Sequence, residues 1–415
     1  MKLSQSSQIL FRNFSALTVL QIGNYLFPLV TFPYLVRVLG PAKYGLVNFA
    51  AAFTAYFTII VNYGFHLSAT REISVIRDDA EKLARKFWTV IFTKFLLLLL
   101  SVPLFAILIF SFEKFSSNVS VYTLSFLAVF GAALFPDWFF QGIEKMKAIA
   151  VINLSVKALW VVAIFLFVKS ADDILLLIFL NGVSLSVIGL IGLLYAKFSF
   201  ALKFVVPSSK EIFTQLKSGY HVFLSTISIS LYTTSNVFIL GLIAGDVAVG
   251  YFTAADKIRI AVQGIFDNIA KTIYPRVSIL LNEDLQKAKI FIKKYSAIIH
   301  LVTSFIALII FIYADKTVEF FLGGGYEYSI KILEVIIFLI VLQLSSNIAG
   351  VQIMLNLKYD KQFLNITVWG GVINVFVAII VVTLWGVIGM AVSFVSVELF
   401  ITLAFWKFVI KEKLI

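Results

Sequence analysis

Seven ionisable side chains lie inside long apolar stretches of this sequence, where a charge is costly. They are Lys94, Lys157, Asp256, Lys257, Arg259, Asp267 and Glu398. A charged group at the centre of a bilayer costs about 2.5 to 3.5 kcal/mol even on the mildest scale, so a residue placed there usually has a functional role. We predict that the four cations, joined by Arg37 just beyond another apolar stretch, bind an anionic ligand. The three acids are the candidates for carrying H⁺ or Na⁺.

The stretch at 249–273 holds the most regular of these patterns. Its polar residues are three or four positions apart, and they are Asp256, Arg259, Gln263, Asp267 and Lys271. At about 100° per residue they share one face of a helix, so Gln263 and Lys271 join the predicted binding surface. Either this face lines a hydrated cavity, or Asp256 pairs with Arg259 and Asp267 pairs with Lys271 within the helix. Pairing leaves the alignment of Gln263 unexplained, which favours the cavity.

The elements that must carry these residues are membrane-spanning helices. Of 415 residues, 61% are hydrophobic and only 13% are charged, whereas soluble domains have about 25% charged residues. About twelve apolar runs are long enough to cross a hydrocarbon core as a helix. They lie at 14–35, 44–66, 87–110, 121–140, 149–168, 174–196, 220–244, 249–273, 295–313, 332–355, 363–384 and 386–408. The runs are continuous rather than alternating, which excludes a barrel and predicts an all-α integral membrane fold.

Basic residues set the expected orientation of these helices. Lys and Arg are roughly four times as frequent in the loops on one side as on the other, and basic loops stay in the cytoplasm. Both termini of an even number of spans are therefore expected inside the cell. The same excess accounts for the net charge of +12, so no nucleic-acid partner is needed. With no cysteine and three scattered histidines, no metal site is predicted.

A weak internal repeat indicates two halves. A shift of 205 residues, from 40 to 245, places Gly40 and Gly45 on Gly245 and Gly250. Six spans separate the copies, so both halves have the same orientation, as in transporters that bind a ligand between parallel repeats. We therefore predict one six-helix bundle at 1–200, a cytoplasmic linker at 201–217 and a second six-helix bundle at 218–415, related by a pseudo-two-fold axis.

Several short motifs resemble those of a known family. They are Arg12-Asn13-Phe14, the segments 34–41 and 44–45, the segment 136–144 that begins Pro-Asp-Trp-Phe-Phe-Gln-Gly, the segments 250–252 and 254–258, and Tyr274-Pro275. Each is short, but their combination in both halves of the chain resembles the Wzx-type polysaccharide flippases of the multidrug/oligosaccharidyl-lipid/polysaccharide exporter superfamily.

The resemblance implies two six-helix bundles around a central cavity whose basic residues receive the substrate. The implied substrate is an undecaprenyl-diphosphate-linked oligosaccharide repeat unit. It would be flipped by alternating access from the cytoplasmic to the periplasmic leaflet of the bacterial inner membrane, for O-antigen, lipopolysaccharide or capsule assembly. No cofactor is expected beyond a coupling H⁺ or Na⁺. Membrane lipids and other polysaccharide-assembly membrane proteins are the expected partners.

Two other functional classes share some of these features. A flippase for the peptidoglycan lipid precursor, or a multidrug exporter, has the same architecture and differs in its substrate. A membrane polysaccharide polymerase or glycosyltransferase usually needs a large extramembrane loop, and the largest predicted outer loop here is short, at 315–331. We therefore predict a transporter and not an enzyme.

Overall fold

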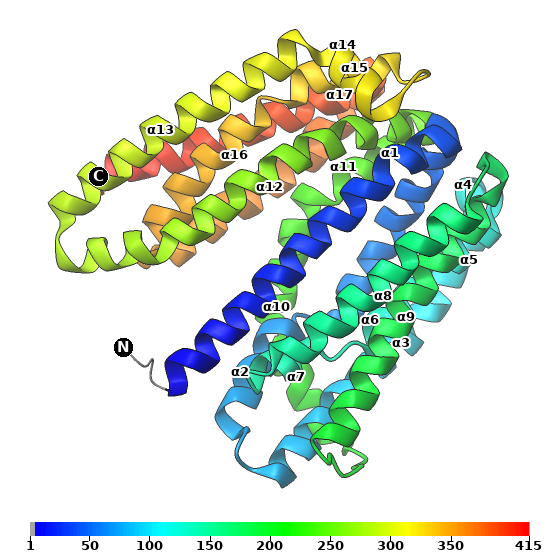
Figure 1. Cartoon of the computed structure of the whole chain (residues 1–415), viewed down its shortest axis with the longest axis vertical. Coiled ribbons are helices and arrows are strands. Elements are labelled where there is room, and N and C mark those ends of the chain that lie inside the picture. Colours follow the sequence, from blue (N-terminus) through cyan, green and yellow to red (C-terminus); the bar gives the residue numbers. More distant parts are fainter. Residues whose placement is uncertain (1–4, 415) are drawn as a thin grey trace. The chain divides into compact units, whose positions relative to one another are not determined.

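The computed structural model describes residues 5–414, with side chains for all of these except 5–22, 24, 25, 232 and 282. The side chains of the motif Arg12-Asn13-Phe14 lie outside that set. The described residues form helices and turns without any strand (Figure 1). The predicted all-α fold is confirmed.

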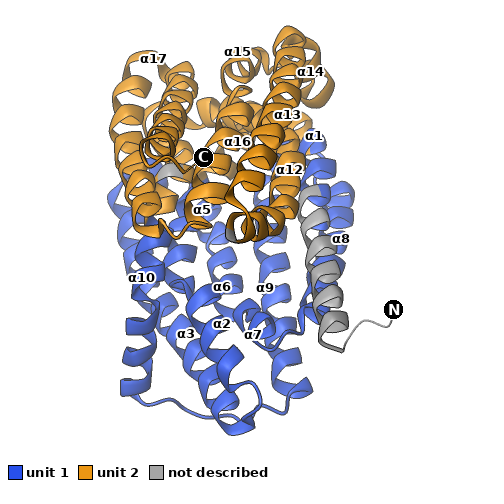
Figure 2. Ribbon diagram, turned by 90° about the vertical axis from the view of Figure 1, so that its left-hand side faces the viewer, with its two compact units in different colours: residues 1–34, 50–227 blue, residues 35–49, 228–415 orange. Residues whose placement is uncertain are grey.

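Contacts between residues divide the chain into two compact units, which Figure 2 shows in different colours. The first unit comprises residues 1–34 and 50–227, and the second comprises residues 35–49 and 228–415. These units do not follow the boundaries of the predicted halves. Residues 35–49 pack with the second unit, and residues 209–217 of the predicted linker are already helical and belong to the first.

The first unit is built from short and long helices in chain order. Its elements are both ends of α1 (Gln5–Asn62), α2 (Phe65–Ile76), α3 (Ala80–Ser111), α4 (Glu113–Ser116), α5 (Val119–Ser125), α6 (Leu127–Leu134), α7 (Asp137–Gly142), α8 (Met146–Phe167), the 3-10 turn η1 (Ala171–Asp173), α9 (Ile174–Ser199) and most of α10 (Ser209–Thr233). Its aromatic core includes Phe87, Trp138 and Phe139, which are at most 1% exposed.

The second unit holds the polar stripe predicted at 249–273. Its elements are the middle of α1, the end of α10, α11 (Ser235–Ile243), α12 (Gly245–Glu283), α13 (Leu285–Ile312), α14 (Ala314–Leu322), α15 (Glu327–Ile336), α16 (Leu339–Asn347), the π-helix η2 (Ile348–Leu355) and α17 (Asp360–Lys411). Within this unit α12 packs against α11, α13, α15, α16 and α17.

Eight helical stretches of the described chain are long and apolar enough to cross a membrane, or nine if the bent pair α10 and α11 counts as one span. The number twelve stays a prediction. Helices α1 and α17 each cover two predicted spans, which meet at Gly40 and Gly386, where φ is 66° and 58°. Glycine adopts this backbone without the steric cost that a Cβ brings, so each long helix can change direction there.

Glycines that the internal repeat matches make reciprocal contacts in the second unit. A Cβ on Gly45 would lie 1.7 Å from the carbonyl oxygen of Asp246, and a Cβ on Gly250 would lie 2.0 Å from that of Pro41. Pro41 and Asp246 are themselves matched by the 205-residue shift. Each copy of the repeated segment, one at 40–45 and the other at 245–250, therefore contacts the other in the same way, as a pseudo-two-fold relation requires.

Helix α12 turns its polar face toward the protein. Arg259 and Gln263 are 4% and 7% exposed, whereas Ile265 and Ile279 are 62% and 47% exposed. A helix on the surface of a soluble protein has the opposite distribution. The exposed apolar side chains fit a lipid environment, and the buried part of the polar stripe, at Arg259 and Gln263, faces the protein interior.

Candidate functional site

Arg259 lies at the centre of a polar group on α12, α16 and α17. Its Nε donates a hydrogen bond to Asp256 Oδ1 at 2.7 Å, and its Nη1 donates to Gln343 Oε1 at 2.9 Å. The guanidinium also lies over the ring of Phe394, 5.6 Å from the ring centre. We call these four residues the Arg259 cluster. It joins one full positive charge to one negative charge, an amide and an aromatic face.

The local spacing on α12 explains the first of these contacts. Residues three positions apart are neighbours on a helix, so Asp256 neutralises Arg259 within its own helix. This is the pairing that the sequence offered as an alternative to a cavity. The side chain of Arg259 is 5% exposed and that of Asp256 is 18% exposed, so the pair is largely removed from solvent. Its desolvation must be offset by its contacts.

A second polar contact connects α16 to the buried acid on α17. Ser346 Oγ lies 2.8 Å from Glu398 Oε1 and 3.0 Å from the carbonyl oxygen of Gln343. Gln343 thus contacts Arg259 through its side chain and Ser346 through its backbone. Glu398 is 1% exposed, and its Oε2 has no hydrogen-bond partner among the described residues. The Arg259 cluster and Glu398 are therefore connected through one turn of α16.

The rest of the predicted stripe is only partly brought together. Gln263 Nε2 donates to Asp267 Oδ1 at 3.0 Å, while Gln263 Oε1 is buried without a hydrogen-bond partner among the described residues. Lys271 and Lys257 are exposed. No ion pair joins Asp267 to Lys271, whose side chains the structure describes, so the pairing alternative is found only at Asp256 and Arg259.

The other predicted cations are carried by other elements. Arg37 is exposed, and its Nη2 donates to the carbonyl oxygen of Phe320 at the end of α14, at 2.5 Å. Lys94, in the first unit, is 1% exposed, and its Nζ donates to the carbonyl oxygen of Phe135 at 3.0 Å. Lys157 is half-buried on α8, also in the first unit. Neither unit by itself collects the five cations into one site, and their role in binding stays a prediction.

Sequence reasoning missed the contribution of α16 and of Phe394. Gln343 and Ser346 are three residues apart within an apolar run, and Phe394 and Glu398 are four apart within another. Such spacing places each pair on one helix face, which is a usable signal. The spacing cannot show that this face of α16 and this face of α17 both pack against α12. In the part of the chain that the structure describes, no group of three His, Cys, Asp or Glu side chains could hold a metal ion.

Comparison with solved structures identifies the fold. The fold resembles that of a multidrug resistance MATE family transporter of the MOP superfamily in an inward-facing conformation, with a TM-score of 0.70, 16% identity and coverage of 91% of this chain and 92% of the other. It also resembles the lipid II flippase MurJ in an inward closed conformation, with a TM-score of 0.71, 14% identity and coverage of 97% and 87%. At such identities the likeness shows the fold alone, which this chain shares with these two membrane transporters.

Sequence comparison defines the family. Residues 10–281 match the family described as polysaccharide biosynthesis protein. A protein of Escherichia coli (strain K12), provisionally named an O-antigen transporter, is 34% identical over 404 residues, which are 97% of each chain. A protein of Shigella dysenteriae with the same provisional name is 30% identical over 401 residues, 95% of this chain and 99% of its own. The chain belongs to the polysaccharide biosynthesis protein family, and its predicted resemblance to Wzx-type flippases is confirmed.

Proposed function

We propose that this protein flips an O-antigen-type oligosaccharide, linked to undecaprenyl diphosphate, from the cytoplasmic to the periplasmic leaflet of the bacterial inner membrane. The main support is the similarity to the two O-antigen transporters over almost the whole chain. The fold supports transport rather than catalysis, because MOP-superfamily transporters share it. The polymerase or glycosyltransferase alternative has no such support.

The chemistry of the substrate assigns a role to the buried cation. A polyprenyl tail can remain in lipid, whereas a diphosphate and sugars need a polar path across the hydrocarbon core. The planar guanidinium of an arginine binds phosphate oxygens through two parallel donors. We assign this role to Arg259, because no described residue accepts a hydrogen bond from its Nη2. The second parallel donor is Nε, which becomes available when the ligand displaces the Asp256 carboxylate.

Asp256 has a second role in this proposal. A diphosphate that binds Arg259 competes with the Asp256 carboxylate for the same cation, so Asp256 limits the affinity of the cluster for its ligand. A transporter needs such a limit, because a ligand bound too tightly is not released on the other side. Asp267 and Glu398 are then the acids left to couple the cycle to H⁺ or Na⁺.

Complementation tests the role of Arg259. In a host that lacks its own O-antigen flippase, Arg259→Ala should insert into the membrane and, compared with wild type at matched protein abundance, fail to restore surface polysaccharide. The matched control is Arg276→Ala, which removes an exposed arginine from the same helix and should restore it. Normal polysaccharide with Arg259→Ala would exclude the proposed role.

Reconstitution tests the substrate and the ion coupling. Purified protein in liposomes should flip a defined undecaprenyl-diphosphate oligosaccharide, and excess of that lipid should compete. Competition by the peptidoglycan lipid precursor or by cationic drugs, without competition by the oligosaccharide lipid, would support the other members of the superfamily instead. Collapse of the proton and sodium gradients should slow flipping, and an unchanged rate would remove ion coupling from the proposal.

A further inference from the structure

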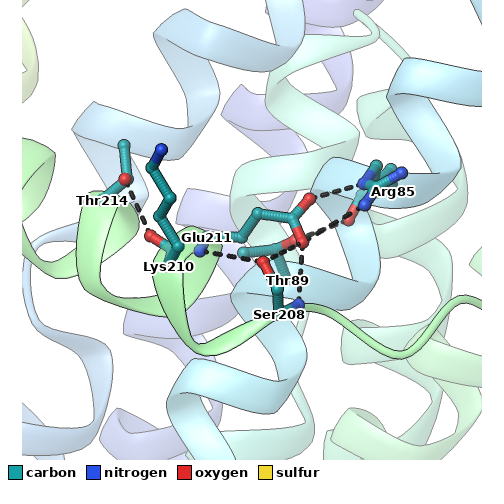
Figure 3. A network of polar contacts seen from close by, with 6 residues as sticks. All are labelled: Arg85, Thr89, Ser208, Lys210, Glu211 and Thr214. Carbon is teal, nitrogen blue, oxygen red and sulfur yellow. Dashed lines mark hydrogen bonds and ion pairs between the residues drawn. The ribbon is translucent and has the colours of Figure 1, made fainter.

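A basic pocket lies between the beginnings of α3 and α10 in the first unit. It has a volume of about 350 Å³, within the range of ligand-binding pockets, and its lining includes Ile76, Lys82, Arg85, Lys86, Lys210 and Glu211. We call it the α3–α10 pocket. Figure 3 shows Arg85 and Glu211 meeting across it, one from each helix. The pocket is separate from the Arg259 cluster, which belongs to the second unit.

Ion pairs neutralise all but one of the lysines and arginines of this pocket. Arg85 Nε binds Glu211 Oε1 at 2.5 Å, and its Nη2 lies 3.4 Å from Glu211 Oε2. Two further pairs complete the set: Lys82 with Asp79 at 2.9 Å, and Lys86 with Glu72. Lys210 has no ion-pair partner among the described residues. The carboxylate of Glu81 also acts on Lys82 and Arg85 through space, without an ion pair. Lys210 is therefore the cation of the lining whose charge no ion pair of the described chain balances.

Unused hydrogen-bond donors accompany this charge. Glu211 takes its remaining bonds from the backbone N and the hydroxyl of Ser208, at 2.8 and 2.7 Å. It therefore occupies the Nε side of Arg85 and leaves Nη1 without an acceptor in the described part of the chain. The ammonium of Lys210 and the Nη1 of Arg85 are thus donors available to a small anion.

The surroundings of the pocket are those of a membrane–water interface. Phe204, Val206 and Phe213 are 60%, 67% and 69% exposed on the segment that leads into α10 and on its first turns. The ring of Phe204 packs on that of Trp88, with 4.8 Å between ring centres. Aromatic side chains collect at the level of lipid headgroups, and the basic loops on this side are expected in the cytoplasm.

We propose that the α3–α10 pocket binds the phosphodiester headgroup of an anionic phospholipid from the cytoplasmic leaflet. A phosphodiester carries one negative charge, which Lys210, the one lysine of the lining without an ion pair in the described chain, can balance. Inorganic phosphate and a polyprenyl diphosphate carry more charge than this pocket can balance. The exposed apolar side chains beside the pocket would accompany acyl chains, and basic pockets between helices on the cytoplasmic side are known to bind lipid headgroups.

Native mass spectrometry of the purified full-length chain, titrated with phosphatidylglycerol, tests this assignment. Lys210→Gln should weaken binding about fivefold, the ratio expected for ~1 kcal/mol per lysine near a membrane surface. The matched control is Lys203→Gln, which removes an equal, exposed charge from the same segment without changing the pocket. It should alter binding less than about twofold.

A variant that is expected to strengthen binding distinguishes an effect on the pocket from an effect of misfolding. Glu211→Gln raises the net positive charge of the pocket by one and should strengthen phosphatidylglycerol binding, an effect that loss of structure cannot imitate. The proposal would be overturned if Lys210→Gln and Lys203→Gln weakened binding equally. It would also be overturned if millimolar inorganic phosphate displaced the lipid, or if the binding of undecaprenyl diphosphate depended on Lys210 and the binding of phosphatidylglycerol did not. Lipid binding is measured without transport, so none of these outcomes decides the proposed flipping.

Discussion

Arg259 Nη1 and Gln343 Oε1, 84 positions apart in sequence, meet at 2.9 Å and join α12 to α16. A hydrogen bond to a charged donor contributes more than one between neutral groups. The amide also fixes the plane of the guanidinium, since Asp256 holds its other edge. The orientation of the Arg259 guanidinium is thus set by one local and one long-range contact.

Loss of the Asp256 charge should destabilise the protein strongly. Asp256→Asn leaves Arg259 buried without its counter-charge, and breaking a buried pair in this way costs about 3–5 kcal/mol. Thermal unfolding in detergent should show a large fall in the midpoint temperature. Asp267→Asn serves as the control, because Asp267 contacts Gln263 and no cation among the described residues. A similar fall for both variants would contradict the pairing.

Gln343 and Arg259 should be energetically coupled. Gln343→Ala removes the amide from Nη1, and Arg259→Lys removes the planar fork that uses it. A double-mutant cycle on unfolding free energy should give a coupling of about 1.5–3 kcal/mol, the range for hydrogen bonds to charged groups. Additive effects of the two substitutions would show that this contact contributes little.

Glu398→Gln should separate ion coupling from structure. Glutamine keeps the size of the side chain and the contact with Ser346 Oγ, but it cannot take up or release H⁺. If Glu398 carries the coupling ion, the variant should remain folded while its flipping rate no longer responds to an imposed proton or sodium gradient. Ser346→Ala, which removes only the partner, should keep that response. A gradient-dependent Glu398→Gln protein would assign coupling to another acid.

The helix cap at Asp284 should make stability depend on pH. Its carboxylate accepts backbone N–H bonds from Lys287 and Gln286, which together with the Lys287 ammonium lower the pKa of Asp284 below its ordinary value. A depressed folded-state pKa adds stability that is present above the unfolded pKa and is lost as pH falls through the folded one. Asp284→Ala should therefore be less stable than wild type at pH 7, and the difference should shrink in acid.

Asp284→Asn is the control for that measurement. Asparagine caps a helix about as well as aspartate but does not titrate. Its unfolding midpoint should stay near that of the wild type at pH 7. The midpoint should fall less in acid than that of the wild type, because the side chain at position 284 no longer titrates. Equal pH profiles for all three proteins would exclude a contribution from the cap.

The contact between Asp256 and Arg259, which the sequence offered as the alternative to a cavity, lies within one helix. The spacing of Asp256 and Arg259 is local, so a helical period is enough to place them together. Gln343 and Ser346 reach the same cluster through packing of α16 on α12, which no local pattern encodes. Hydropathy likewise separated the predicted spans at 35–44 and at 384–386, and the non-helical backbone of Gly40 and Gly386 lies at these two breaks. It could not show that the chain turns there on a single residue, so that the helices on either side follow each other directly.

The reciprocal glycine contact provides the last prediction. Gly45→Ala would place a methyl group 1.7 Å from the Asp246 carbonyl oxygen, so the middle of α1 and the start of α12 must separate. Forcing extra atoms into a packed site costs typically about 1–3 kcal/mol, and the unfolding midpoint should fall accordingly. Gly324→Ala adds the same methyl group where nothing lies within 4 Å and should be tolerated. Equal stability of the two variants would mean that α1 and α12 do not meet at Gly45.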